Sequence, residues 1–568
     1  MYRWWEANAA RWECEQQALG DAGIEFSIDQ PAAKAGRLIL NLAVQWEGQP
    51  LRLVAHFPTP YPYFPPIVFA KDLSLTRHQT PGSSQLCLLK VDEWDGQTDT
   101  LAWMLTSQLQ ELHAAQPGGL GEDAQGYEAE PLTAYLAKDE NSFVGFPTYD
   151  FDVLPASGTF RIGVEQVNPL RGTVLEVLDQ DGHRMFASEA KSASNYASPG
   201  QIMVGRWVKL STRPAFGDAK RFYDAAIEAL PALASPLWQR PSSGAWRADF
   251  IALLFQDELG FKELGGNAVV VNKTQLLKPK SGNVGKPRLN RTELESRANY
   301  FQRDAMSAEL QKGCVAVVGV GSVGSPVAKS LAQSGIGALR VIDHDVLDAG
   351  NAIRWELGRQ GAGYPKAHIL QRYIEANWPY TKVEGVNWRV GDAQYAANPA
   401  EPELFEKLFT DVTCLVDATA AKATSNYLAD LARHHGLPFV WMHATNGAWG
   451  GLVGRAGPNK GDFCWMCHRY YLDDRTIPKL LAAPEEEKIQ PAGCLDATFI
   501  GSQVDLSEVS QMGARLIIDE VLTRVGAKDN SAYEWNVAVL ELHDAQGRLQ
   551  LPKWTPYVLP PHPKCPKH

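Results

Sequence analysis

A glycine-rich loop at the end of a short apolar run could bind a nucleotide phosphate. Cys314–Val318 is expected to form a buried strand, and Gly319, Gly321 and Gly324 follow it, ahead of a helical pattern that reaches about Ser334. The glycines permit a tight turn and let backbone N–H groups approach phosphate at the helix N-terminus. Taken alone, this fingerprint is most typical of a dinucleotide-dependent dehydrogenase.

Polar and charged residues beyond the glycines favour a different reaction. A second expected strand, Ala338–Ile342, leads to Asp343, an acidic residue placed to bind a ribose hydroxyl. Asn351, Arg354 and Lys366 follow. Hydride transfer has no need for these groups beside the phosphates. Adenylyl transfer does need them, because negative charge develops on the α-phosphate and on the departing pyrophosphate.

The order of these motifs over residues 319–419 resembles the adenylation domain of the ThiF/MoeB and ubiquitin-activating family. A third expected strand, Cys414–Thr419, completes the pattern and brings Asp417 to the carboxyl end of the sheet, where ligands bind. The resemblance implies that the cofactors are ATP and Mg²⁺, with Asp343 on the ribose and Asp417 near the metal. It assigns the phosphate contacts to Asn351, Arg354 and Lys366.

The same resemblance raises two further points. Arg303, in Tyr300–Arg303, stands where the family carries an arginine that reaches into the partner subunit's site, so a homodimer is expected. The family usually has a second Asp shortly after the first as a magnesium ligand, and here that position is Ala420. Asp417 would then hold the metal, or the coordination would be weaker.

Cys464 and Cys467 have the two-residue spacing that lets two thiolates share one tetrahedral metal ion. Relatives of this family often close a structural zinc site with a late second pair of ligands, and here that pair would be Cys565 and His568. The resemblance therefore implies structural Zn²⁺ held by three sulfurs and one nitrogen. The competing ligands are His562 and His468.

Cys494 stands apart from these ligands, in Pro491–Gly501, and precedes an expected helix at Val509–Leu522. This arrangement resembles the crossover segment of activating enzymes, in which a cysteine precedes a helix packed near the nucleotide. The resemblance implies that the Cys494 thiolate takes an acyl group from the adenylate and holds it as a thioester.

The stretch around Cys87 resembles ubiquitin-conjugating enzymes. The run Phe57–Pro66 is followed by His78, Cys87 and Trp94 in the order of that family. The prolines hold an extended segment rigid at low entropic cost, and this segment would support the loop that carries the nucleophile. The resemblance implies that Cys87 exchanges with a thioester and then yields its acyl group to an amine.

The His-Pro-Asn motif of the conjugating enzymes is altered in this chain. The sequence has His78, Gln79 and Thr80, and no Asn. In the family the Asn is thought to support the loop or the oxyanion during aminolysis. Thr80, Gln79 or Ser83 would have to substitute for it.

The composition fits a multidomain protein and argues against a general nucleic-acid binder. The chain has 568 residues, 45% of them apolar, and a formal net charge of −11, which opposes binding to phosphate backbones. It has no uncharged apolar stretch of roughly 18 residues and no signal-peptide core at its start. Eight cysteines are too sparse for a disulfide scaffold, so we expect a cytoplasmic protein in a reducing environment.

These segments predict a multidomain protein of α+β and α/β classes. Residues 1–139 would form a ubiquitin-conjugating-like α+β domain that opens with a helix at Trp4–Leu19. Residues 140–285 would form a mixed linker domain to which no chemistry is assigned. Residues 286–568 would form a Rossmann-like adenylation domain.

Conjugating, linker and activating domains in one chain resemble the CD-NTase-associated fusions of bacterial CBASS anti-phage operons. The resemblance implies that the enzyme joins the C-terminal carboxylate of a CD-NTase to an amine of an acceptor protein or small molecule. Conjugation of another bacterial ubiquitin-like modifier is the second choice. A sulfur-carrier adenylyltransferase would leave Cys87 unused, and an NAD-dependent dehydrogenase would explain only the glycines.

Overall fold

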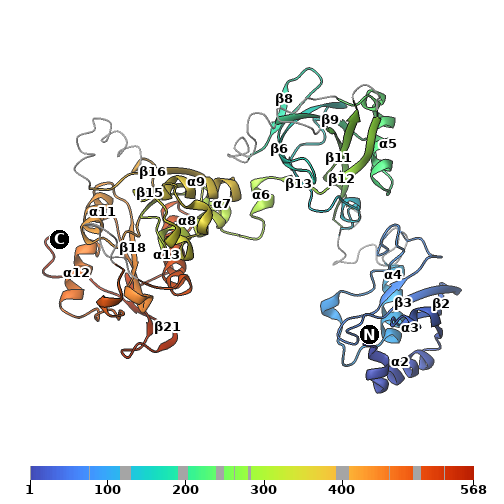
Figure 1. Ribbon diagram of the computed structural model, residues 1–568, viewed down its shortest axis with the longest axis horizontal. Coiled ribbons are helices and arrows are strands. Elements are labelled where there is room, and N and C mark those ends of the chain that lie inside the picture. Colours follow the sequence, from blue (N-terminus) through green and yellow to red (C-terminus); the bar gives the residue numbers. More distant parts are fainter. Residues whose placement is uncertain are drawn as a thin grey trace. The chain divides into compact units, whose positions relative to one another are not determined.

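The computed structural model forms two compact units, one of residues 1–187 and 200–294 and the other of residues 188–199 and 295–568. Figure 1 labels several helices and strands of each unit. The expected division into three domains, with boundaries at 139 and 285, stays a prediction. The described residues are 2–568 without 76, 115–128, 190–201, 238–247, 261–262, 279–282, 392–408, 460, 490–499 and 530.

The N-terminal part of the first unit is an antiparallel meander between helices. Its strands pair in chain order, so each neighbour in the sequence is a neighbour in the sheet. Side chains along β2 alternate between a buried and an exposed face, as expected for a sheet with one covered side. The elements are α1 (Trp4–Ala7), α2 (Ala9–Asp21), β1 (Glu25–Ile28), α3 (Gln30–Lys34), β2 (Ile39–Trp46), β3 (Gln49–His56), β4 (Ile67–Phe69), the short 3-10 helix η1 (Val91–Glu93) and α4 (Leu101–Ala114).

One hydrophobic core holds this meander and its helices together. Trp4 is 1% exposed and contacts Phe57 and Tyr61 of the proline-rich run through ring packing. Leu19 of α2 and Leu105 of α4 join the same core. The expected N-terminal helix is therefore present, with a break between α1 and α2, and the proline-rich run is tied to it by aromatic contacts.

A nine-stranded mixed sheet forms the rest of the first unit. Its order is β12-β11-β10-β9-β6-β7-β5-β13, with β8 paired to β7. Alternate residues of β10 enter two different cores, Phe250 on one face and Ile251 on the other, and α5 covers the second face through Phe222. The elements are η2 (Leu132–Ala134), β5 (Phe143–Pro147), β6 (Ser157–Gln166), β7 (Arg171–Leu178), β8 (Arg184–Ala187), β9 (Ile202–Lys209), α5 (Ala219–Ala229), η5 (Pro231–Ala234), β10 (Ala248–Gly260), β11 (Glu263–Lys278), β12 (Asn283–Asn290) and β13 (Thr292–Glu295).

The second unit has a doubly wound sheet, in agreement with the expected Rossmann-like class. Five parallel strands in the order β16-β15-β14-β17-β18 continue into the antiparallel strands β19, β20 and β21. Helices α8, α9 and α13 share one core and α11 and α12 another (Figure 1). The strands are β14 (Cys314–Val318), β15 (Ala338–Asp343), β16 (Lys382–Asn387), β17 (Cys414–Asp417), β18 (Phe439–Ala444), β19 (Gly450–Ala456), β20 (Val537–His543) and β21 (Leu549–Tyr557).

The helices of this unit follow the expected βα order at the nucleotide motif. β14 runs through the glycines directly into α8, and β15 leads to the segment that carries Asn351 and Arg354. The helical elements are α6 (Arg297–Tyr300), α7 (Ser307–Leu310), α8 (Gly324–Gln333), η6 (Ala349–Arg354), η7 (Gly358–Gly361), α9 (Lys366–Asn377), α11 (Lys422–His434), η8 (Asn446–Ala448), α12 (Trp465–Asp473), η9 (Glu485–Glu487) and α13 (Gln503–Arg524).

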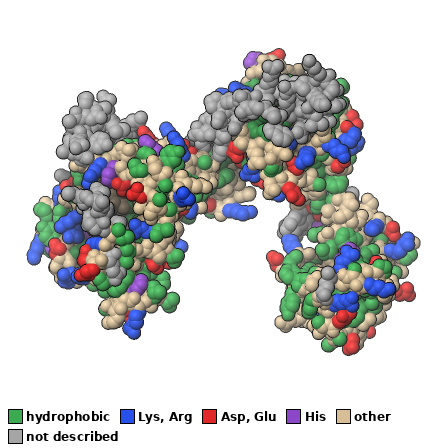
Figure 2. Space-filling model, viewed as in Figure 1, with side chains coloured by type: hydrophobic (Ala, Val, Ile, Leu, Met, Phe, Trp, Pro, Cys, Tyr) green, Lys and Arg blue, Asp and Glu red, His purple; other side chains and the backbone are tan. Residues whose placement is uncertain are grey.

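Basic and acidic side chains are interspersed over the face drawn in Figure 2. Among the described residues, no helix combines the length and the apolar character that a membrane crossing needs.

Candidate functional site

A cavity of about 260 Å³ opens at the carboxyl ends of the parallel strands in the second unit. The glycine loop after β14, the segment after β15 and the segment after β17 all contribute to its wall. Open parallel sheets bind ligands at this edge, because loops from neighbouring strands meet there. The cavity is therefore the candidate nucleotide site. Its lining includes Gly321, Asp345, Asn351, Arg354, Lys366 and Thr419.

The three glycines of the loop have different physical roles. Gly319 has φ +83°, and a Cβ there would stand 2.9 Å from the backbone at Ala418. A Cβ on Gly324 would stand 1.9 Å from the Gly319 carbonyl oxygen, so side chains are excluded at both positions by the packing of the loop. A Cβ on Gly321 would meet no atom within 4 Å. Gly321 therefore leaves open space on the cavity wall, as close approach of a phosphate requires.

Asn351, Arg354 and Lys366, although separated in sequence, line the same cavity. The Lys366 ammonium is 2.8 Å from Asp345 Oδ2, and that ion pair fixes its side chain toward the site. Burial lowers the pKa of the Arg354 guanidinium from its ordinary value, which still leaves Arg354 charged at neutral pH. These groups can neutralise charge on a triphosphate and on departing pyrophosphate.

The two carboxylates expected to serve ribose and metal do not line the cavity directly. Asp343 accepts hydrogen bonds from the backbone N–H groups of Val320 and Asp345, each at 2.8 Å, and so supports the glycine loop. Asp417 is 2% exposed and accepts from the Thr419 hydroxyl at 2.7 Å, and burial raises the pKa of its carboxyl. Their roles toward ribose and magnesium stay predictions.

The sequence interpretation missed two side chains of the cavity wall. Asp345 lies there beside Lys366, and the Asp343-x-Asp345 spacing already held the signal for it. His443, at the end of β18, also lines the cavity, and burial lowers the pKa of its ring to about 4. No local motif marks His443, because only the sheet brings β18 next to β17.

Arg303 lies on an exposed segment just after α6, outside the cavity wall. This position neither brings Arg303 to the nucleotide site of its own chain nor tests its expected role in a partner's site. Cys494 lies outside the described residues. The helix expected after it is present as α13, which is longer than the expected Val509–Leu522 and packs on α8 and β18.

The structure brings Cys464, Cys467, Cys565 and His568 together, with one ligand atom of each within 4.8 Å of the others. The Cys464 Sγ lies 3.6 Å from the Cys467 Sγ and 3.7 Å from the Cys565 Sγ. Tetrahedral zinc with sulfur at about 2.3 Å would separate its ligands by about 3.8 Å. The donor set and spacing therefore fit Zn²⁺.

The two competing histidines are engaged elsewhere. The His562 ring lies 3.1 Å from an oxygen of Asp474, while its backbone N–H donates to the Cys467 Sγ at 3.2 Å. His468 is 2% exposed and packs against Trp441. His562 thus supports the cluster from outside it, as partners of metal ligands often do.

Cys87 is exposed, at the end of a short loop that follows the proline-rich run. Its backbone N–H donates to the His78 carbonyl at 2.8 Å, and Gln79 forms an isolated antiparallel bridge with Leu86. His78 has φ +57°, a conformation that costs free energy for a residue with a side chain. The loop therefore holds Cys87 in a defined, strained turn.

Gln79 takes over loop support at the position after His78. Its side-chain amide donates to the carbonyls of Ala70 and Leu73 at 2.9 and 2.8 Å, and its oxygen accepts from the Leu75 N–H at 2.8 Å. Both donors of the amide are thereby used within the loop. Gln79 consequently cannot also donate to an oxyanion without breaking these bonds.

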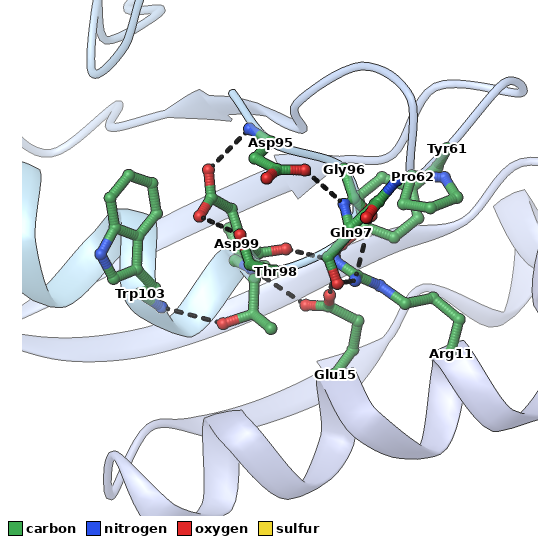
Figure 3. A network of polar contacts seen from close by, with 12 residues as sticks. Arg11, Glu15, Tyr61, Pro62, Asp95, Gly96, Gln97, Thr98, Asp99 and Trp103 are labelled. Carbon is green, nitrogen blue, oxygen red and sulfur yellow. Dashed lines mark hydrogen bonds and ion pairs between the residues drawn. The ribbon is translucent and has the colours of Figure 1, made fainter. Parts of the chain in front are cut away.

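A buried polar network lies between helix α2 and the segment that precedes α4 (Figure 3). Glu15 of α2 is fully buried and accepts from the Tyr61 hydroxyl, from Arg11 at 2.8 Å and from the Leu101 N–H at 3.0 Å. Arg11 also donates to the carbonyl of Asp99. The network thus joins helix α2, the proline-rich run and the start of α4.

Three groups outside the meander lie against the Cys87 loop. The Glu130 carboxylate accepts from the His78 N–H at 2.9 Å and lies 3.3 Å from the His78 ring. Glu258 of β10 accepts from the Glu130 N–H at 2.6 Å and pairs with Arg77. The third group, Tyr135, lies near Glu130, whose carboxylate acts together with burial to raise the pKa of the Tyr135 phenol. No sequence motif pointed to any of these three residues.

The chain resembles known proteins over two different extents, one limited to its C-terminal half and one nearly complete. Residues 296–548 match the model of the ThiF family. The uncharacterized protein y4oA of Sinorhizobium fredii is 27% identical over 608 residues, spanning 99% of this chain and 97% of the relative. The uncharacterized protein y4qC of the same organism is 28% identical and spans 97% of this chain and 95% of that protein.

Shorter similarities fall on proteins with named activities. The SAMP-activating enzyme E1 of Haloferax volcanii is 29% identical over 27% of this chain and 54% of that enzyme. The crystal structure of MccB of E. coli with ATP covers 46% of this chain and 68% of its own, at 15% identity and a TM-score of 0.33. The match of residues 296–548, together with the doubly wound sheet and its cavity, shows that the C-terminal half of the chain is a ThiF-type, E1-like adenylation domain.

Proposed function

We propose that this chain activates the C-terminal carboxylate of a protein with ATP and conjugates it to an amine through two cysteine thioesters. One observation carries the proposal. A ThiF-type cavity lined by Asn351, Arg354 and Lys366 occurs in the same chain as an exposed cysteine, Cys87, on a braced loop. A sulfur-carrier adenylyltransferase would need only the first of these features.

Adenylation comes first, because a carboxylate is a poor acyl donor until it has a good leaving group. The cationic side chains of the cavity would stabilise the negative charge that develops on the triphosphate. Cys494 then attacks the adenylate, since it belongs to the same domain in sequence. Cys87 receives the acyl group from Cys494 by thiol exchange, and an amine finally attacks the Cys87 thioester to make an amide.

Several contacts support the N-terminal step of this sequence. Cys87 lies on a rigid and exposed turn. This turn is supported by the antiparallel meander, by the packed proline-rich run and by the hydrogen bonds of Gln79. A nucleophile that exchanges with a large thioester requires that exposure, while rigidity limits the entropy lost in each transfer. A CD-NTase is the proposed acyl donor, in the setting of CBASS antiviral defence, and an acceptor protein or small-molecule amine the proposed recipient.

The proposed cofactors are MgATP in the cavity and structural Zn²⁺ at the three cysteines and His568. Asp343 and Asp417 would act at the ribose and the magnesium, either directly or through the loops that they support. The zinc would connect α12 to the chain's last residues and so close the C-terminal part of the domain. Metal binding of this kind is coupled to folding.

Exchange of labelled pyrophosphate into ATP tests the adenylation step. A CD-NTase with a free C-terminus should stimulate exchange, and one whose C-terminal carboxylate is amidated should not. Lys366→Ala should lower exchange at least about a hundredfold, as loss of a phosphate-stabilising group does. Lys553→Ala, on a surface pair with Glu541, is the matched control. Exchange that needs no carboxylate, or that survives in Lys366→Ala, contradicts the proposal.

The expected homodimer has its own test. Arg303→Ala and Asp417→Ala chains would each be inactive in exchange if one chain's arginine completes the other's site. Mixing the two should then restore part of the activity, because some mixed dimers contain one intact site. A mixture as inactive as its components, from chains that do associate, would argue that Arg303 has no role in a shared site.

A further inference from the structure

The acyl-transfer site at Cys87 includes groups from the nine-stranded sheet and from the segment that precedes it. Glu130 lies beyond α4, yet its carboxylate bonds the backbone N–H of His78 through both oxygens, at 2.9 and 3.1 Å. The His78 carbonyl in turn accepts from the Cys87 N–H at 2.8 Å. Glu130 and Cys87 therefore both form hydrogen bonds with the backbone of the same residue, His78.

Glu130 is held in place by β10. The Glu258 carboxylate accepts from the Glu130 N–H at 2.6 Å and also pairs with Arg77, the residue before His78. The Arg77 and Glu258 side chains are each 6% exposed. A charge pair this buried is costly to break, so it fixes the end of β10 against the Cys87 loop. The sheet thus contacts the Cys87 loop through Glu258.

Charged and titratable groups surround the Glu130 carboxylate on each element packed against it. They are His78 and Arg77 on the Cys87 loop, Glu258 on β10 and Tyr135 after η2. Burial raises the pKa of the Tyr135 phenol to about 12, and the hydrogen bond to Glu130 acts in the same direction. Tyr135 therefore stays neutral and can orient the carboxylate as a donor. The Glu130 side chain keeps 16% exposure, which leaves access for an incoming amine.

Aminolysis of a thioester needs a proton acceptor near the cysteine. The amine nitrogen attacks the acyl carbon and becomes positively charged, and it must lose a proton before the amide is stable. Gln79 cannot take this proton, because an amide is not a base and its donors are used within the loop. The His78 ring and the Glu130 carboxylate, which lie 3.3 Å apart beside the Cys87 loop, are groups that can accept a proton.

We propose that Glu130, held by Glu258 of β10 and by the His78 backbone, accepts the proton of the amine that attacks an acyl group on Cys87. The new C–N bond forms as the C–S bond breaks, the electron pair of that bond leaves with the Cys87 sulfur, and the amine proton passes to the carboxylate. The nine-stranded sheet is thereby a wall of the acyl-transfer site. This inference rests on the proposed function of Cys87.

A chemical acyl donor separates this step from adenylation. The full chain is treated with the mercaptoethanesulfonate thioester of N-acetylglycine, which loads Cys87 by thiol exchange without ATP, and loading is quantified by peptide mass spectrometry. Release of the acyl group is then timed with two nucleophiles. Lysine is mostly protonated near neutral pH and needs a proton acceptor. Hydroxylamine is largely neutral at that pH, and its weakly basic nitrogen gives its proton to water after the attack, so it does not depend on a protein group.

The proposal predicts that Glu130→Gln loads normally but transfers to lysine at least about tenfold more slowly, within the range that general-base groups contribute. Hydroxylamine should release the acyl group at the wild-type rate. Glu140→Gln, at an exposed glutamate farther along the same segment, is the matched control.

Equal losses with lysine and hydroxylamine would overturn the proposal, because they would mean that Glu130 only shapes the loop. Unchanged rates in Glu130→Gln would overturn it as well. Glu258→Gln, which keeps Glu130 but weakens its anchor, should give a smaller loss with lysine alone. Failure of the underlying function looks different: the wild-type Cys87 thioester would react with lysine no faster than the thioester of free N-acetylcysteine.

Discussion

The buried network around Glu15 allows a prediction that separates two contributions of this side chain to stability, its hydrogen-bonded shape and its negative charge. Glu15 accepts from the Tyr61 hydroxyl, Arg11 and the Leu101 N–H in a fully buried site. Glu15→Ala removes all three acceptor contacts and leaves the Arg11 charge without its carboxylate. Breaking one side of a buried pair costs about 3–5 kcal/mol. Glu15→Gln keeps a side-chain oxygen and the side-chain volume.

Burial is the main influence on the Glu15 carboxyl, and it raises the pKa of that group above its ordinary value. The folded state then holds the proton to higher pH than the unfolded state does. Stability from this group is present below the ordinary glutamate pKa and is lost as pH rises through the raised folded value. Glu15→Gln keeps an acceptor for Tyr61 and Arg11, which Glu15→Ala does not, although its amide nitrogen would face the Leu101 N–H. It should therefore cost only about 1 kcal/mol at neutral pH.

Hydrogen exchange at the Leu101 amide provides a local assay, because that N–H donates directly to Glu15. A loss of about 3–5 kcal/mol in Glu15→Ala should reduce protection of peptides spanning residues 94–104 by a factor of about 100 to 1,000 or more. Glu15→Gln should keep protection within about tenfold of wild type and should abolish the fall in wild-type stability between acidic and neutral pH. Equal damage from Gln and Ala would refute the reasoning, since charge would then carry the network.

Three further predictions concern the metal, the glycine loop and the order of transfer. Cys565→Ser should lower the zinc content of the purified protein from about one ion per chain, measured by elemental analysis, and should destabilise the second unit. Gly321→Ala should fold with a cost below about 1 kcal/mol yet bind ATP more weakly by calorimetry, because the methyl enters the cavity, whereas Gly324→Ala should destabilise by about 3 kcal/mol in thermal unfolding, because the added Cβ meets backbone. Cys87→Ala should retain an ATP-dependent, reductant-sensitive adduct on Cys494, while Cys494→Ala should still release pyrophosphate and load neither cysteine.

The sequence predicted those parts of the site whose residues lie close together along the chain. The run from β14 through Gly324 into α8 follows from apolar residues, glycines and a helical pattern within one short stretch. Cys464 and Cys467 are likewise adjacent in sequence, and the late pair was expected from the family. Local sequence also indicated β15 and β17, whose observed bounds differ from the expected ones by one or two residues.

The parts that sequence reasoning missed depend on contacts between distant segments. His443 reaches the cavity because β18 lies beside β17, and Glu258 reaches the Cys87 loop from a strand far along the chain. The Gln79 side chain bonds the preceding loop through contacts that no local pattern announces, and which of three residues substitutes for the missing Asn stays a prediction. Local sequence likewise could not show which histidine ring lies with the three cysteines. The structure places the His568 ring there and the His562 ring beside Asp474.

Trapping the acyl group at the conjugating cysteine tests the central claim most directly. In a Cys87→Ser chain an acyl group transferred from Cys494 would form an ester, which is stable to reductant and can be mapped by mass spectrometry after purification from the native host. The account predicts a protein joined through its C-terminal carboxylate to the side chain at position 87, and no such ester when Lys366→Ala is added. Active ATP–pyrophosphate exchange without any ester at position 87 would contradict it, as would an ester that persists in the Lys366→Ala chain.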